Sequence, residues 1–397
     1  MRSTTRLLSD LSDSQIDLND FAGSDGYLFV RDGVGVAGRG VAQRVDRNTA
    51  ESCLRNIKDD NQSGVADAGP IAIGCIPFTS TDAHEFVIPK VVIGKTQSGE
   101  QWITTVDDAE FEFEQSQKPL AVASSFSVNP GVSVDHYLEA VRLTAEAVRE
   151  NKLAKAVIAR DIFVSSSQSF DVRAILLRLK ASFGSSYRYL FEGFIGASPE
   201  LLISVLGNQV KSHPLAGTVP RTGNIETDTK FAQELIASAK NQLEHRIVID
   251  MVRDTLLPWC SFLDWQADPS IVSVANVQHL GTEISGQLSE PRPSVLDLAY
   301  ALSPTPALGG APREIALDHI AQVEGMNRGR YGGAVGFFNA KGDGKFAVSI
   351  RCAEFDASQT TARLFAGGGI VADSEPQNEL AETQAKFQAM LAALIRP

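Results

Sequence analysis

The order in which strands are expected along this chain limits its fold more than any other feature. Short apolar segments separated by turn residues fill about the first 120 positions, which is typical of β-strands. Residues 334–338 and 345–354 are expected to form a hairpin across a turn at 341–344. Further strands are expected in runs, at 155–164, 187–194, 201–205, 209–212 and 271–274. Strands that arrive in runs favour antiparallel sheets with helices outside over a doubly wound parallel sheet, so the sequence predicts the α+β class.

Apolar residues that recur at helical spacing predict helices among and after these strands. The expected helices cover 133–151, 171–180, 228–257, 294–302 and 374–395. No internal repeat and no Pro/Ser-rich linker divides the 397 residues. We therefore predict a single domain over residues 1–397, since large α/β domains reach this size.

The last of these helices carries the most informative pattern. It is expected to begin at Ser374, and one apolar face should point to the core, made of Leu380, Phe387, Leu391 and Leu394. Beside that face runs a stripe roughly 60° wide, made of Glu375, Glu379, Glu382 and Lys386. Carboxylates in a line repel one another unless a cation or a basic partner lies among them.

The stripe follows a β-prone segment that is interrupted by Gly367, Gly368 and Gly369. Because glycine has no side chain, other groups can approach this backbone closely. One interpretation of the stripe is a solvated helix face on which Glu382 pairs with Lys386. We favour a ligand site, because a glycine-rich anion nest would hold an anion while the carboxylates hold a divalent cation.

Composition excludes several classes of function. The chain has 48 acidic and 36 basic residues, a net charge of −12, which is opposite in sign to that of most nucleic-acid-binding proteins. No apolar segment approaches the ~20 residues that cross a bilayer, and the N-terminus lacks the apolar core of a signal peptide. The four cysteines are far apart and form no metal or redox motif. We therefore expect a cytoplasmic monomer with a small-molecule substrate and with no nucleic-acid or membrane partner.

Residues 33–38 match the dinucleotide-binding pattern G-x-G-x-x-G, which raises the alternative of a nicotinamide-dependent oxidoreductase. In that class a helix follows the glycines and binds the pyrophosphate at its N-terminus. No helical spacing follows Gly38, and Gly40 extends the turn-like composition. We interpret this segment as a turn.

Four isolated side chains could carry chemistry. Lys155 opens an apolar strand, where it is either a charged strand end or a partly desolvated lysine able to act as a base. Glu200 follows a proline at a strand start, and burial there would raise its pKa and make it a proton donor. Arg351 lies within an expected apolar strand, so it is either paired internally or directed at a ligand carboxylate. His279 could donate a hydrogen bond to an anion, although a structural histidine is the simpler interpretation.

Two further carboxylates could form a metal site if the fold brings them together. Glu244 lies in the middle of one expected helix and Glu382 in another. Mg²⁺ prefers a few carboxylate oxygens together with retained water. The alternative for Glu244 is a surface ion pair with Lys240, four residues earlier, and we interpret His245 as a packed residue.

Six short blocks in this order resemble the chorismate-utilising enzymes, which include the isochorismate, salicylate, anthranilate and aminodeoxychorismate synthases. They are Gly-Ala-Ser-Pro-Glu (196–200), Pro-Leu-Ala-Gly-Thr (214–218), Pro-Thr-Pro-Ala-Leu-Gly-Gly (304–310), Tyr-Gly-Gly-Ala-Val-Gly (331–336), Ile-Arg-Cys-Ala (350–353) and Phe-Ala-Gly-Gly-Gly-Ile-Val (365–371). The segment 125–392 holds all of these catalytic motifs, and Gly-Cys-Ile-Pro-Phe at 74–78 extends the resemblance toward the N-terminus. The resemblance implies two stacked, mostly antiparallel β-sheets flanked by helices, with chorismate as the substrate and Mg²⁺ as the cofactor.

Matched block by block, the resemblance implies a role for each candidate residue. Glu244 and Glu382 look like the Mg²⁺ ligands. Lys155 is similar to the base that activates water, and Glu200 to the acid that protonates the departing hydroxyl group. The implied substrate-binding residues are Ala216, Gly217, Thr218, His279, Leu308, Tyr331, Ile350, Arg351, Gly367 and Lys386. The implied reaction adds water at C2 of chorismate and removes the C4 hydroxyl group.

Single positions separate the branches of this family. Lys155 favours water over ammonia as the nucleophile, and Ala216 replaces the nucleophilic lysine of one type of aminodeoxychorismate synthase. Leu308 and Ile350 resemble isochorismate synthases, whereas a residue like Tyr331 also occurs in the salicylate-forming group. We expect an isochorismate synthase that serves menaquinone or siderophore biosynthesis. The alternatives are a salicylate synthase, which also eliminates pyruvate, and a non-catalytic binding module, which the filled acid, base and metal positions disfavour.

Overall fold

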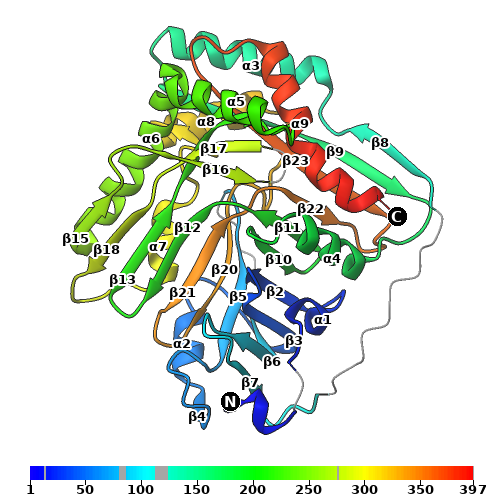
Figure 1. Ribbon diagram of the computed structural model, residues 1–397, viewed down its shortest axis with the longest axis vertical. Helices are drawn as coiled ribbons and strands as arrows, with labels where there is room; N and C mark the ends of the chain where they lie inside the picture. The colour runs from blue at the N-terminus through cyan, green and yellow to red at the C-terminus, as the bar shows by residue number, and fades with distance from the viewer. Residues whose placement is uncertain (13–14, 80–85, 112–123, 275–276, 397) are drawn as a thin grey trace.

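The structure is a computed structural model that describes residues 1–12, 15–79, 86–111, 124–274 and 277–396 (Figure 1). The strands and turns predicted within 112–120 lie outside the described residues. The described helices are α1 (Leu18–Ala22), α2 (Ala50–Arg55), α3 (Val134–Arg149), α4 (Val172–Ser182), α5 (Ile225–Ala237), α6 (Ala239–Leu256), α7 (Val295–Leu302), α8 (Arg313–Val323) and α9 (Pro376–Ile395), with 3₁₀ turns at Leu8–Asp10 and Leu257–Trp259. The described strands are β1 (Arg2–Leu7), β2 (Tyr27–Arg31), β3 (Val34–Val45), β4 (Lys58–Asn61), β5 (Ile71–Ile76), β6 (Phe86–Lys95), β7 (Gln101–Val106), β8 (Phe126–Pro130), β9 (Lys155–Ser166), β10 (Tyr187–Phe191), β11 (Phe194–Ser198), β12 (Leu201–Leu206), β13 (Gln209–His213), β14 (Leu215–Pro220), β15 (Cys260–Trp265), β16 (Ser270–Val274), β17 (Val277–Gly281), β18 (Ile284–Leu288), β19 (Gly310–Ala311), β20 (Ala334–Asn339), β21 (Gly344–Val348), β22 (Cys352–Phe355) and β23 (Thr361–Ile370).

Hydrogen bonds join 20 of the described strands into one network, and β14, β17 and β16 form a separate small sheet. One layer of the network follows the pairs β8–β9–β23–β22–β11–β10–β2–β3–β6. At β6 the network turns into a second layer, β5–β20–β21–β12–β13–β18–β15. Among the described strands only β1 and β4 pair in parallel. The predicted α+β class with stacked, mostly antiparallel sheets is confirmed.

The main hydrophobic core lies between the two layers. Phe29 of the first layer packs on the Phe337 ring of the second, with ring centroids 5.7 Å apart. A second cluster fills the space between the outer face of the first layer and the helices that cover it, where Phe387 and Leu394 of α9 are buried. Figure 1 shows α9 lying across β23 and β9, so the outer face of this layer supports the C-terminal helix.

Three expected elements are each divided in the structure, one of them the strand predicted over 345–354, which is β21 and β22. The helix predicted over 228–257 is α5 followed by α6, because the chain breaks at Ser238, whose side chain accepts the Asn241 N–H and caps α6. The strand predicted over 187–194 is the hairpin β10–β11, which turns at Glu192 and Gly193 with positive φ. The helical periodicity continues across Ser238 and gives no sign of that break. Glu192 and Gly193, by contrast, interrupt the apolar residues and are a turn signal that the prediction did not use.

Two boundaries also differ from the prediction. Helix α9 begins at Pro376 with Glu375 as its N-cap residue, whereas the hydroxyl group of Ser374 accepts the Val371 N–H. Arg351 lies between β21 and β22 with a φ of 52°, so it is not a strand residue as predicted. The glycine motif at 33–38 forms the turn and strand of the β2–β3 hairpin, so a strand and not a helix follows its first glycines, as expected.

Candidate active site

The predicted site residues surround one cavity. Its walls come from the start of β9, from β14, β17 and β23, and from α6 and α9. The predicted residues that line it are Glu200, Ala216, Gly217, Thr218, Glu244, His279, Leu308, Tyr331, Ile350, Arg351, Gly367, Glu382 and Lys386. Lys155 is fully buried and reaches this group through Glu244, to which its Nζ donates at 2.7 Å. The fold therefore brings together residues that are up to 231 positions apart in the sequence.

The glycine run makes room for this site. Gly367, Gly368 and Gly369 belong to β23 and pair with β9 in extended conformation, without left-handed φ, so the predicted anion nest is wrong. A Cβ atom on Gly368 would lie 2.7 Å from Glu379 Oε2, and one on Gly369 would lie 2.5 Å from Glu244 Oε1. The absence of side chains at Gly368 and Gly369 is what lets carboxylates from α6 and α9 lie against the strand.

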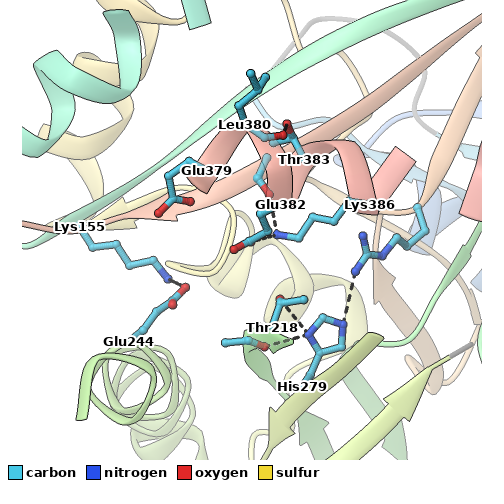
Figure 2. A network of polar contacts seen from close by, with 12 residues as sticks. Lys155, Thr218, Glu244, His279, Glu379, Leu380, Glu382, Thr383 and Lys386 are labelled. Carbon is cyan, nitrogen blue, oxygen red and sulfur yellow. Dashed lines mark hydrogen bonds and ion pairs between the residues drawn. The ribbon is translucent and has the colours of Figure 1, made fainter. Parts of the chain in front are cut away.

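Carboxylates of the cavity are paired with lysines, as Figure 2 shows for Glu244 and Glu382. Lys386 Nζ donates to Glu382 Oε1 at 2.5 Å and to the Gly367 carbonyl at 2.7 Å. The ion pair that we considered as part of a solvated face is therefore present, but it lies within the cavity wall. Lys240 Nζ lies 3.6 Å from Glu379 Oε1 and links α6 to α9.

Glu379 was predicted only as a member of the carboxylate stripe, and Lys240 only as a possible ion-pair partner of Glu244. Both line the cavity, where Glu244 pairs with Lys155 instead and Lys240 lies beside Glu379. Glu379 is only 4% exposed, and its pKa is raised by burial and by the neighbouring charge of Glu382. The signal was present in the carboxylate stripe, of which Glu379 is a member. The stripe did not show which of its carboxylates would turn toward β23.

Two carboxylates of the cavity are the candidates for holding a divalent cation. Glu244 of α6 and Glu382 of α9 face the same cavity and present carboxylate oxygens from opposite sides of it (Figure 2). Within the part of the chain that the structure describes, no cluster of three or more His, Cys, Asp or Glu side chains is arranged to hold a metal. Mg²⁺ needs only one or two protein carboxylates when substrate and water oxygens complete its shell, so Glu244 and Glu382 fit this ion.

Glu200 has the protonation state of an acid catalyst. It is 3% exposed, and burial raises its pKa to about 8 against the opposing effects of the Leu215 N–H and of the charges on Lys155 and Arg351. The predicted rise in pKa is confirmed. At neutral pH most Glu200 side chains therefore carry a proton.

His279 orients the arginine of the site. Its Nδ1 lies 2.9 Å from the Gly217 carbonyl, and Arg351 Nη2 lies 3.4 Å from its Nε2. Burial and the charge of Arg351 lower the pKa of His279 to about 3, so the ring is neutral. Because arginine only donates, Nε2 accepts and the proton is on Nδ1. Both ring nitrogens are thus occupied, which favours the structural interpretation of His279 over a direct hydrogen bond to an anion.

Arg351 itself is available for a ligand. Among the described residues no carboxylate forms an ion pair with it, although it lines the cavity. Burial lowers its pKa, and a guanidinium group remains charged in such a place. By contrast His245, one residue after Glu244, is buried and bonded to Thr282 Oγ1 at 2.8 Å, as expected for a packed residue.

Known proteins resemble this chain in sequence and in fold. A family model described as "Chorismate binding enzyme" matches residues 44–395. The isochorismate synthase DhbC of Bacillus subtilis (strain 168) is 34% identical over 354 residues, 86% of this chain and 83% of the relative. The isochorismate synthase MenF of the same organism is 35% identical over 373 residues, 85% of this chain and 78% of the relative.

The solved structure of MenF, the menaquinone-specific isochorismate synthase of Escherichia coli, matches with a TM-score of 0.83. The match covers 99% of this chain and 94% of that one at 22% identity, which bears on the fold alone. The chain belongs to the chorismate binding enzyme family. Within the described residues, no helix combines the length and the apolar character needed to cross a membrane.

Proposed function

We propose that the protein is an isochorismate synthase, which adds water at C2 of chorismate and removes the C4 hydroxyl group. The observation that carries this proposal is that Glu200 and Arg351 line one cavity and Lys155 lies behind its wall, bonded to Glu244, in a chain that resembles isochorismate synthases over most of its length. Water addition needs a base and departure of hydroxide needs an acid. The site supplies both kinds of group.

The roles follow from protonation and placement. Glu200 holds a proton at neutral pH, since its pKa is about 8, and can give it to the departing C4 oxygen. Lys155 is the proposed base, which takes a proton from the attacking water when its side chain is in the neutral amine form. Arg351 and Lys386 bind the substrate's carboxylates, because both are cations on the cavity wall.

We propose Mg²⁺ as the cofactor, held by Glu244 and Glu382. When bound, the ion would neutralise substrate carboxylate charge and fix the orientation of the ring. Lys155 and Lys386 each form an ion pair with one of these two carboxylates and so hold it in place. We further propose a cytoplasmic monomer, since no disulfide joins the cysteines within the described residues, which is consistent with a reducing compartment.

The test is the product profile of the purified protein with chorismate and Mg²⁺, resolved by chromatography. Isochorismate as the sole product supports the proposal. Salicylate with pyruvate would indicate a salicylate synthase instead, which the buried Tyr331 hydroxyl on the cavity wall keeps as the second candidate. Unchanged chorismate would indicate a binding module that lacks the activity.

A further inference from the structure

A buried ion pair lies behind the cavity wall and does not contact the cavity. Glu324, which follows α8, and Arg328 are each only 2% exposed at the side chain, and Arg328 Nη2 lies 2.5 Å from Glu324 Oε2. Neither residue is among the described residues that line the cavity. A buried ion pair needs further hydrogen bonds to offset its desolvation, and these bonds show what the pair holds.

The pair fills a gap in the sheet beside the proposed base. The edge of β9 opposite β23 pairs with β19 at Lys155 and Ala156, and with β8 only from Ile162 onward. Between these two partners, Glu324 Oε2 accepts the Ala159 N–H at 2.8 Å, and Arg328 Nη2 donates to the Val157 carbonyl at 2.7 Å. Two side chains thus supply the hydrogen bonds that a neighbouring strand would supply.

Arg328 also binds the other walls of the cavity. Its Nη1 donates to the Leu308 carbonyl at 2.7 Å, and its own carbonyl accepts the Tyr331 N–H at 3.0 Å. The guanidinium group lies over the Phe78 ring, 4.2 Å from the centroid. Val157, Leu308 and Tyr331 all line the cavity, so one buried residue is hydrogen-bonded to three of its walls.

We infer that Glu324 and Arg328 are positioning residues for the reaction: they fix the strand that begins with Lys155 relative to the walls formed by Leu308 and Tyr331. This inference rests on the proposed function, because it assigns Lys155 a catalytic role. A displacement of about 1 Å in such a wall can lower a rate about a hundredfold, so the pair acts on turnover without touching the substrate.

The test compares Arg328→Lys with a matched control, Arg292→Lys. Arg292 also donates to one carboxylate, Asp343, and to two backbone carbonyls, those of Gly207 and Lys341, and none of these three partners lines the cavity. A lysine keeps the charge in both places but cannot bond several acceptors in a fixed plane. Both variants should therefore lose thermal stability to a similar degree.

For Arg328→Lys we expect kcat per folded molecule to fall about tenfold or more with KM within about threefold, because the carboxylate-binding groups lie on other elements. For Arg292→Lys we expect kcat within about twofold of the wild type. The inference is overturned if kcat of Arg328→Lys stays within about twofold of the wild type, or if the control loses as much. If Arg328→Lys does not fold, Glu324→Gln replaces it, with an expected fall in kcat of about threefold or more.

A second measurement does not depend on turnover. Hydrogen–deuterium exchange in the segment Val157–Ala159 should be about tenfold faster in Arg328→Lys, or in Glu324→Gln, than in the wild type and in Arg292→Lys. Equal exchange in all variants would refute the sheet-completing role. A wild type that leaves chorismate unchanged would refute the proposed function, while the exchange experiment would still decide whether the pair holds β9.

Discussion

The raised pKa of Glu200 gives a prediction whose size can be worked out. Its pKa is about 8, against an ordinary value of 4.5. A shift of one unit corresponds to about 1.4 kcal/mol, so ionising this carboxyl group in the folded protein costs up to about 5 kcal/mol more than in the unfolded chain. The figure is an upper bound, because water can enter as the buried group becomes charged.

The direction in which stability changes with pH follows from the proton that Glu200 binds in the folded and in the unfolded protein. Between about pH 4.5 and pH 8 the folded protein holds a proton on Glu200 that the unfolded chain has released. The contribution of Glu200 to stability is therefore fully present below about pH 4.5, falls as the pH rises through this window, and levels off above about pH 8. Glu200→Gln imitates the protonated form and cannot ionise, so it lacks this pH dependence.

The assay is denaturant unfolding of the wild type and of Glu200→Gln in steps from about pH 5 to pH 9. As the pH rises across this range, the unfolding free energy of the variant should increase by about 3 to 5 kcal/mol relative to that of the wild type. The variant should also lose about 10²- to 10⁴-fold in kcat, since an amide cannot give a proton to the leaving hydroxyl group. Wild-type kcat should fall above about pH 8, where the acid is lost. A stability difference that does not change with pH would refute the burial argument for Glu200.

Three other changes test the site. Lys155→Ala should lower kcat by about 10²- to 10⁴-fold with the fold retained in circular dichroism, and substantial turnover would remove Lys155 as the base. Glu244→Ala or Glu382→Ala should raise the Mg²⁺ concentration for half-maximal activity by about tenfold or more, whereas an unchanged requirement would contradict the ligand assignment. Gly369→Ala should lower the unfolding free energy by about 1–3 kcal/mol and remove most of the activity. The new Cβ atom would lie 2.5 Å from Glu244 Oε1 and 2.6 Å from Lys155 Cε. A fully active variant would show that β23 can move away from these side chains.

Much of the fold could be predicted from local patterns. Runs of strands gave the antiparallel class, and the apolar face of α9 is placed as expected, with Phe387 and Leu394 buried. The break at Ser238 and the position of Arg351 between two strands were not predicted, because the helical pattern continues past Ser238 and apolar residues continue on both sides of Arg351. Periodicity indicates which face of a helix or strand is apolar. It does not indicate where that helix or strand ends.

The candidate site was predictable in a different way. Lys155, Glu200 and Glu244 were singled out by residue type, but their meeting in one cavity was implied by the resemblance and not by spacing. The glycine run was correctly expected to allow close approach, while the approaching groups are carboxylates rather than an anion held by backbone N–H groups. Glu324 and Arg328 carried no signal, because a Glu–Arg pair four residues apart usually lies on a helix surface.

Charge balance in the cavity links the proposed cation to the substrate. The cations at the site are Lys155, Lys240, Lys386 and Arg351. Three carboxylates oppose them, Glu244, Glu379 and Glu382, while Glu200 stays protonated near neutral pH. Each lysine is paired with one carboxylate, so the four cations and three carboxylates leave one net positive charge to meet a substrate with two negative charges. Mg²⁺ would supply the missing positive charge, so each ligand should bind more tightly when the other is present. The factor by which Mg²⁺ raises the affinity for chorismate should equal the factor by which chorismate raises the affinity for Mg²⁺. Titration calorimetry of each ligand in the absence and presence of the other measures both factors, and independent binding would show that the lysines already provide enough charge.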